Sequence, residues 1–178
     1  MLQEYINKAR LPLNLSIKCI TSASCLSAGD ALREIDSMGI VRSDPFILIS
    51  GDVISNMDLK KAMKFHSERR KFDSNAIMTV VLKQVQGSAA IKPVMDDLIV
   101  ALDRNTSQLV YFEDNVRSST IRLPIEIMKE HSNIYFANDL LDCHIDICSP
   151  ELLLQFSDNF DYQVSPLKSP IFIRCIYL

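Results

Sequence analysis

An alternation of short apolar runs with amphipathic helical stretches most constrains how the first half of this chain can fold. The run PFILIS (Pro45–Ser50) has the length of a strand and lies between helical patterns at Ala28–Met38 and Leu59–Lys71. A second apolar run, Asn75–Val85, follows the second helical pattern. Uninterrupted apolar strands are typical of a parallel sheet covered on both faces. We therefore predict an α/β, Rossmann-like domain with flanking helices and a mixed, mostly parallel sheet.

Other parts of the chain show the alternating pattern of half-buried strands. Leu13–Ile20 alternates apolar and polar residues and predicts a strand before the first helix. Leu98–Asp103 and Leu109–Asp114 flank a polar turn and predict a β-hairpin, and Ser132–Asn138 predicts a further short strand.

Charge and composition exclude several classes of protein. The formal net charge is −3, so the chain lacks the basic field that binds nucleic acid phosphates. No stretch reaches the roughly 18 apolar residues of a membrane span, and the first residues lack the pattern of a signal peptide. The five cysteines have no C-x-x-C spacing, so we expect reduced thiols in a cytoplasmic protein.

Glycine content argues against a nucleotide site built on a glycine-rich turn. The chain has only four glycines, and neither common phosphate-binding motif can be assembled from them. They are Gly29, Gly39, Gly51 and Gly87.

Asp52 is the best-placed single carboxylate. It directly follows the predicted strand Pro45–Ser50 and Gly51, and α/β sheets bind ligands at the carboxyl ends of their strands. A Mg²⁺ ion that bridges nucleotide phosphates would suit such a carboxylate. The alternative is a turn aspartate that bonds to its own backbone.

Cysteine and histidine cluster later in the chain, at Cys143–Cys148, but their spacing is poor for a metal or a nucleophile. Cys143, His144 and Cys148 should lie in a strand, where Cys143 faces away from both His144 and Cys148. We therefore expect no catalytic residue, no metal ligand and no cofactor. Ser149 and Pro150 then have the residue types of an N-cap and a first helical position, which predicts a helix to about Phe156.

Three segments together resemble a known family. They are SAGDALREID (Ser27–Asp36), VRSDPFILISGDVISN (Val41–Asn56) and LLDCHIDICSPELLLQFSDNFDYQ (Leu140–Gln163). In order and spacing they resemble the epsilon subunit of eukaryotic translation initiation factor 2B, a guanine-nucleotide exchange factor. The resemblance extends over roughly residues 10 to 164.

This resemblance implies an N-terminal domain of the sugar-nucleotide pyrophosphorylase type. The base-binding Ala-Gly of those enzymes corresponds to Ala28-Gly29, and their magnesium aspartate corresponds to Asp52. The chain begins after the position of their glycine-rich phosphate loop and stops before their second magnesium carboxylate. Gly29, Gly51 and Asp52 are thus vestigial candidates for a nucleotide site.

The resemblance also implies a domain organisation. Residues 1–164 should form a partial nucleotidyltransferase-like domain, truncated at both ends, and residues 165–178 a divergent tail. The tail contains two Ser-Pro dipeptides before an apolar end. This pattern is compatible with an edge strand and equally with a poorly packed terminus. We expect a fragment or an aberrant gene product, without the exchange domain of the family.

By this resemblance, the domain should act in assembly and docking. Its implied partners are the other subunits of the factor, especially gamma, and initiation factor 2. An Asn-Phe pair implicated in docking corresponds to Asn159 and Phe160, although this segment could equally be a helix C-cap with a packed aromatic. The rival interpretations are a Mg²⁺-dependent sugar-nucleotide nucleotidyltransferase that uses Asp52, and an inert misfolded fragment.

Overall fold

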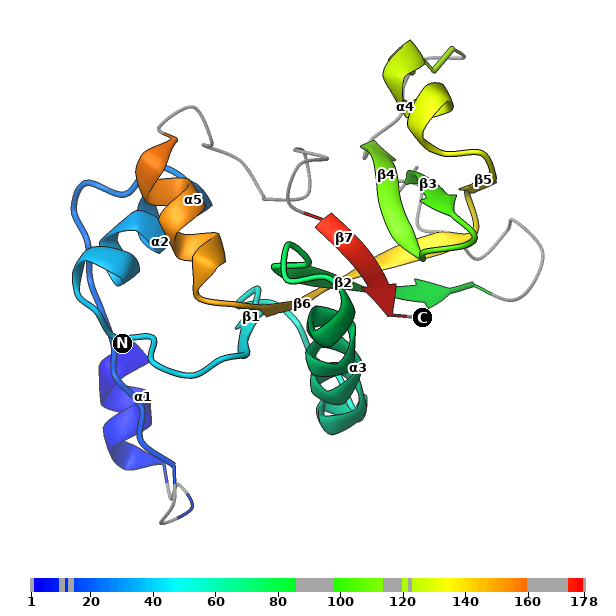
Figure 1. Ribbon diagram of the computed structural model, residues 1–178. Helices are drawn as coiled ribbons and strands as arrows, with labels where there is room; N and C mark the ends of the chain where they lie inside the picture. The colour runs from blue at the N-terminus through cyan, green and yellow to red at the C-terminus, as the bar shows by residue number, and fades with distance from the viewer. Residues whose placement is uncertain are drawn as a thin grey trace.

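The computed structural model describes residues 2–9, 12, 15–85, 98–113, 120–121, 123–159 and 173–177. These residues form two sheets with flanking helices (Figure 1). The helices are α1 (Leu2–Lys8), α2 (Ala28–Ser37), α3 (Leu59–Phe72), α4 (Ile125–Glu130) and α5 (Glu151–Asp158). The strands are β1 (Phe46–Ile49), β2 (Met78–Gln84), β3 (Ile99–Asp103), β4 (Gln108–Glu113), β5 (Ile134–Ala137), β6 (Leu140–Cys148) and β7 (Ile173–Tyr177).

The larger sheet has the strand order β1-β6-β2-β7. Strand β6 runs antiparallel to both of its neighbours, and β7 runs parallel to β2. The predicted α/β class is confirmed, but the expectation of a mostly parallel sheet is wrong. Strands β1 and β2 do point in the same direction, as a strand–helix–strand unit requires. A strand from much later in the chain, β6, inserts between them, and no local pattern in β1 or β2 could indicate this.

The smaller sheet is antiparallel throughout, with the order β4-β3-β5. Strands β3 and β4 form the predicted hairpin, and β5 confirms the short strand predicted at Ser132–Asn138. Nδ1 of His131, which follows α4, lies 2.8 Å from Oδ2 of Asp103 at the end of β3. This contact holds the connection between α4 and β5 against the hairpin.

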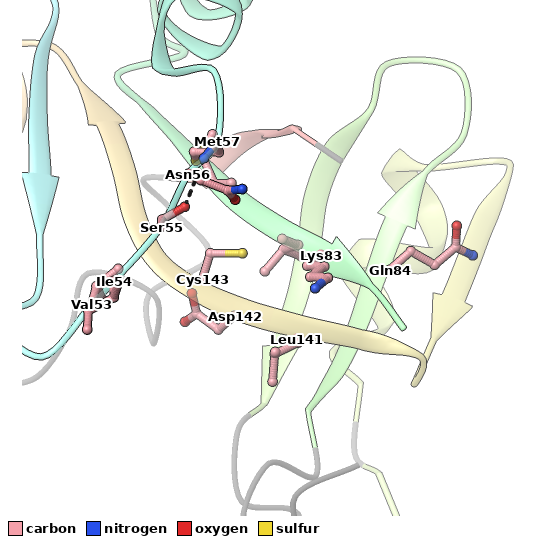
Figure 2. Close-up of a pocket in the computed structure, with 12 residues that line it drawn as sticks. Val53, Ile54, Ser55, Asn56, Met57, Lys83, Gln84, Leu141, Asp142 and Cys143 are labelled. Carbon is pink, nitrogen blue, oxygen red and sulfur yellow. Dashed lines mark hydrogen bonds between the residues drawn. The ribbon is translucent and has the colours of Figure 1, made fainter. Parts of the chain in front are cut away.

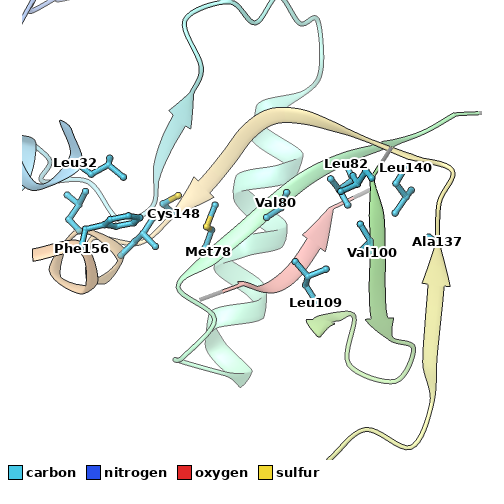
Figure 3. Close-up of a cluster of buried hydrophobic side chains, with 13 residues drawn as sticks. Leu32, Met78, Val80, Leu82, Val100, Leu109, Ala137, Leu140, Cys148 and Phe156 are labelled. Atoms are coloured by element: carbon cyan, nitrogen blue, oxygen red, sulfur yellow. The ribbon is translucent and has the colours of Figure 1, made fainter. Parts of the chain in front are cut away.

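The apolar side chains of β2 supply two clusters on opposite faces of the larger sheet. Met78, Val80 and Leu82 belong to the larger cluster, which extends to Leu32 of α2 and Phe156 of α5 (Figure 3). The smaller cluster contains Ala62, Val81, Ile145 and Ile147. Alternation along β2 therefore joins the helix pair α2–α5 to one face of the sheet and α3 to the other.

Two strand predictions differ from the structure. Residues 15–20 form no strand, and Leu15, Ile17 and Ile20 are exposed, because no neighbouring strand in the described part of the chain pairs with them. The expected burial of Pro45–Ser50 on both faces is also wrong. Among the described strands, β1 is at the edge of its sheet, and Ile49 is 46% exposed.

From Ser149 onward, the structure differs from the predicted helix cap and decides between the two alternatives for the tail. Ser149 was predicted to cap α5, but Pro150 is the N-cap residue and makes no side-chain cap bond. The hydroxyl of Ser149 contacts His66 and Asp44 instead. In the tail, β7 pairs with β2 and lies at the edge of the sheet formed by the described strands. The division of the chain at residue 164 stays a prediction.

Candidate functional site

A cavity of about 570 Å³ lies at the carboxyl ends of β1 and β2 (Figure 2). Its wall is formed by the loop Val53–Met57 after β1, by Val81–Gln84 of β2 and by Leu141–Cys143 of β6. The backbone N–H of Met57 donates to the hydroxyl of Ser55 at 3.2 Å, which shapes the loop. Ligands of α/β sheets occupy this position, so the cavity is the candidate small-molecule site of the fold.

The polar groups at this cavity give it little catalytic capacity. Lys83 and Asp142 supply one charge of each sign to the wall. Burial, reinforced by the negative charge of Asp142, raises the pKa of the Cys143 thiol. A thiol whose pKa is raised is a poor nucleophile at neutral pH, because the thiolate is the reactive form. The cavity can hold a small ligand, but its cysteine is not activated.

The three vestigial candidates are not brought together around the cavity. Asp52 and Gly51 are exposed in the turn after β1, next to the wall residue Val53 but outside the wall itself. A Cβ added to Gly51 would meet no atom within 4 Å, so no close approach in the structure requires a glycine there. Gly29 is buried in α2, which contributes nothing to the wall.

The cysteine–histidine cluster is separated as predicted. Cys143 packs against the smaller apolar cluster, and Cys148 belongs to the larger cluster on the opposite face. His144 has a positive φ of 51°, and its strand shifts register against β2 between Val80 and Leu82. A bulge of this kind directs the His144 side chain outward. No group of three or more metal-ligating side chains is present among the described residues.

The predicted docking residues follow α5. Asn159 is exposed and is the C-cap residue, with its backbone N–H and its Nδ2 donating to the carbonyl of Gln155 at 3.2 and 3.1 Å. Phe160 lies outside the described residues. The structure thus places one member of the pair at an accessible helix end, and the role of both stays a prediction.

A buried polar network was missed from the sequence. His66 of α3 contacts Thr79 of β2 and Ser149 before α5, and Ser149 donates to Asp44. A histidine within a helical pattern carries no local signal of such partners, which are distant in the chain.

A membrane-spanning helix is absent from the described part of the chain, where none is both long and apolar enough. The comparison with family models found no match. Among curated proteins, the chain is 42% identical over 164 residues to the translation initiation factor eIF2B subunit epsilon of Dictyostelium discoideum. It is also 42% identical over 166 residues to the eIF2B subunit epsilon of Schizosaccharomyces pombe.

These matches cover 90% and 91% of the chain, but the chain spans only 23% and 24% of the length of the two relatives. Among solved structures, the chain is similar to HddC from Yersinia pseudotuberculosis, with a TM-score of 0.58 and 14% identity. That likeness covers 98% of the chain and 61% of HddC. At such low identity it shows the fold alone, and it agrees with the predicted α/β fold class.

Proposed function

We propose that this chain, which belongs to the family of the eIF2B epsilon subunit, is an assembly and docking domain of the exchange factor. Its role is to contact other subunits of the factor, gamma among them, and to dock initiation factor 2 in the cytoplasm. The observation that carries the proposal is 42% identity over nine-tenths of the chain. The chain spans about a quarter of the length of those relatives.

The helix end at Asn159 supports the docking role. Its side chain is exposed and is oriented by the last turn of α5. An aromatic residue follows it directly in the sequence, and aromatic side chains dominate the energy of protein interfaces. A fixed amide beside an aromatic residue is a suitable contact for a protein partner.

Exposed apolar side chains around the smaller sheet support the assembly role. Ile125 and Met128 of α4 and Tyr135 and Phe136 of β5 are all exposed. Among the described strands, β5 lies at the edge of its sheet. An edge strand with exposed aromatic side chains is suited to contact another subunit.

A pull-down with initiation factor 2 tests the docking role. The double variant Asn159→Ala, Phe160→Ala should lose most of the binding shown by the 178-residue chain. The matched control is Phe72→Ala, Asn75→Ala, which removes an exposed phenylalanine and an exposed asparagine near the end of α3. The control should bind normally, and equal binding by all three proteins would overturn the docking role.

The cavity favours a second candidate function, Mg²⁺-dependent nucleotidyl transfer. Its position at the carboxyl ends of β1 and β2 suits a nucleotide, but Asp52 is outside the wall. Calorimetry with a nucleoside triphosphate and Mg²⁺ separates the two functions. We expect no saturable binding. Saturable binding that Asp52→Asn abolishes would favour the nucleotidyltransferase instead.

A further inference from the structure

Helices α2 and α5 are joined by two polar contacts at the last turn of α5. Nη1 of Arg33 donates to the carbonyl oxygen of Phe156 at 3.1 Å. The hydroxyl of Ser157 donates to Oδ2 of Asp36 at 2.5 Å. We call these four residues the α2–α5 clamp. Its two contacts are made to consecutive residues of α5, which lie three and two positions before Asn159.

The side chain of Arg33 is held in position by a contact within α2. Its Nη2 donates to Oδ1 of Asp30 at 2.9 Å, and its side chain is only 14% exposed. Asp30 itself accepts from the hydroxyl of Ser27 and from the backbone N–H of Leu26. The guanidinium therefore has a defined position, and little conformational entropy is lost when it binds the Phe156 carbonyl.

The end of α5 needs such support. The last carbonyl groups of a helix have no partner within the helix, and the final turn readily frays. A cation near these carbonyls is favoured by the negative end of the helix dipole. Arg33 supplies both a hydrogen-bond donor and a positive charge at this point. The helix has no basic residue of its own in the last turn.

The apolar contact between the helices does not replace the clamp. Leu152, Leu153 and Phe156 bury the inner face of α5, and Leu32 packs in the same cluster. These contacts hold the body of the helix. Asp158 and Asn159 are exposed, so burial does not fix the direction in which the chain leaves α5. Among the described residues, the clamp contacts are polar bonds from α2 that lie close to that exit.

We propose that Arg33 and Asp36 are positioning residues for the docking end of α5. They hold Asn159 in the orientation that binds initiation factor 2. This inference rests on the docking function proposed above. The clamp lowers the ordering cost of binding, because the helix end is already in place when the partner arrives.

Binding and hydrogen exchange test this role in the 178-residue chain. Arg33→Ala and Asp36→Ala should each weaken binding of purified initiation factor 2 by about 3- to 10-fold, the worth of one hydrogen bond. They should also accelerate exchange of the Asn159 amide proton, which bonds to the carbonyl of Gln155. Asp36→Asn retains an acceptor oxygen for Ser157 and should restore both properties.

Two further variants complete the experiment, one as a control and one as a second test of the clamp. Lys61→Ala removes the cation of another pair spaced three residues apart, Asp58–Lys61 at the start of α3, and should change neither property. Ser157→Ala breaks one clamp contact from the α5 side. Because Ser157 lies on α5, this variant breaks the contact with Asp36 without a substitution in α2. It therefore still tests the clamp if the variants of α2 have a lower melting temperature.

The outcomes distinguish the two proposals. If Asn159→Ala, Phe160→Ala weakens binding but the clamp variants bind and exchange as the parent chain does, the positioning role is overturned and docking stands. If the double variant binds normally, the docking function fails and the positioning role fails with it. Weaker binding and faster exchange in the clamp variants, restored by Asp36→Asn, support both.

Discussion

Nε2 of His66 lies 3.0 Å from the hydroxyl oxygen of Ser149, and both residues are fully buried. The Ser149 hydroxyl donates its single proton to Oδ1 of Asp44, so it must accept from His66. Nε2 of His66 therefore carries a proton. Burial lowers the pKa of His66 to about 4, so the ring is a neutral imidazole at pH 7, and its Nδ1 then accepts from the Thr79 hydroxyl at 2.8 Å. This chain of bonds ties α3 to β2, to the start of α5 and to the loop before β1.

The neutral state of His66 predicts a loss of stability in acid. Burial, and then the positive charge of Arg70, lower the pKa of His66 to about 4. The unfolded chain takes up a proton near pH 6.5, whereas the folded chain does not until about pH 4. The free energy of unfolding should therefore decrease as the pH falls through this window, by roughly 3 kcal/mol for this residue.

Urea unfolding at pH 7 and pH 4.5 measures this contribution. The variant His66→Gln cannot titrate, so its stability should fall less than that of the parent chain between the two pH values. At pH 7 the variant should be less stable by about 1–3 kcal/mol, since its shorter amide leaves a buried partner unsatisfied. Parallel loss of stability in both proteins would contradict a buried neutral histidine.

Phe156 and Phe72 are two phenylalanines in opposite environments, and comparing them tests the packing of α5. Phe156 is fully buried in the larger cluster, and Phe72 at the end of α3 is 87% exposed. Phe156→Ala should reduce the free energy of unfolding by about 3–5 kcal/mol, whereas Phe72→Ala should change it by less than about 0.5 kcal/mol. Thermal melts of both variants check this, and a similar effect of the two would contradict the packing of α5.

Structural features set by neighbouring residues could be predicted from the sequence, whereas features set by contacts between distant residues could not. The helices α2 and α3 and the β3–β4 hairpin were found because their periodicity and turn residues lie within a few positions of one another. The insertion of β6 between β1 and β2 was missed because strand order depends on contacts that are distant in the chain.

The same distinction applies at the candidate site. Strand alternation correctly separated Cys143 from Cys148, although the bulge at His144 was not foreseen. Ser149 has the residue type of an N-cap, but its hydroxyl bonds to Asp44, 105 residues away in the chain. A tertiary partner outcompeted the local cap, and only the fold could reveal that partner.

Burial of Cys148 predicts slow chemical labelling. Its side chain is fully buried, and burial raises the pKa of its thiol well above the ordinary value. Both effects oppose alkylation, so reaction requires opening of the larger cluster. Iodoacetamide should modify Cys19, which is only partly buried, faster by on the order of 100-fold or more. Peptide mass spectrometry over time measures both rates, and similar rates in the folded chain would contradict the burial of Cys148.

The burial of Asp146 predicts that removing its carboxyl group will increase the free energy of unfolding. Its side chain is 7% exposed, and its Oδ1 atom has no hydrogen-bond partner among the described residues. Burial, and then the negative charge of Asp142, raise its pKa well above the ordinary value. An unfolded chain ionises this carboxyl near pH 3.8, whereas the folded chain keeps it protonated to higher pH. The residue therefore lowers the free energy of unfolding progressively as the pH rises above 3.8.

The variant Asp146→Asn keeps the shape of the side chain and removes the ionisable group. At pH 7 it should be more stable than the parent chain, because folding of the variant does not require an ionised carboxyl to take up a proton. The gain should shrink as the pH falls toward 3.8, because the carboxyl of the parent chain is then increasingly protonated in the unfolded state as well as in the folded state. Urea midpoints at pH 7 and pH 4 measure the difference. A gain that is equal at both pH values would show that the substituted amide stabilises by packing and that the buried carboxyl carries no ionisation cost.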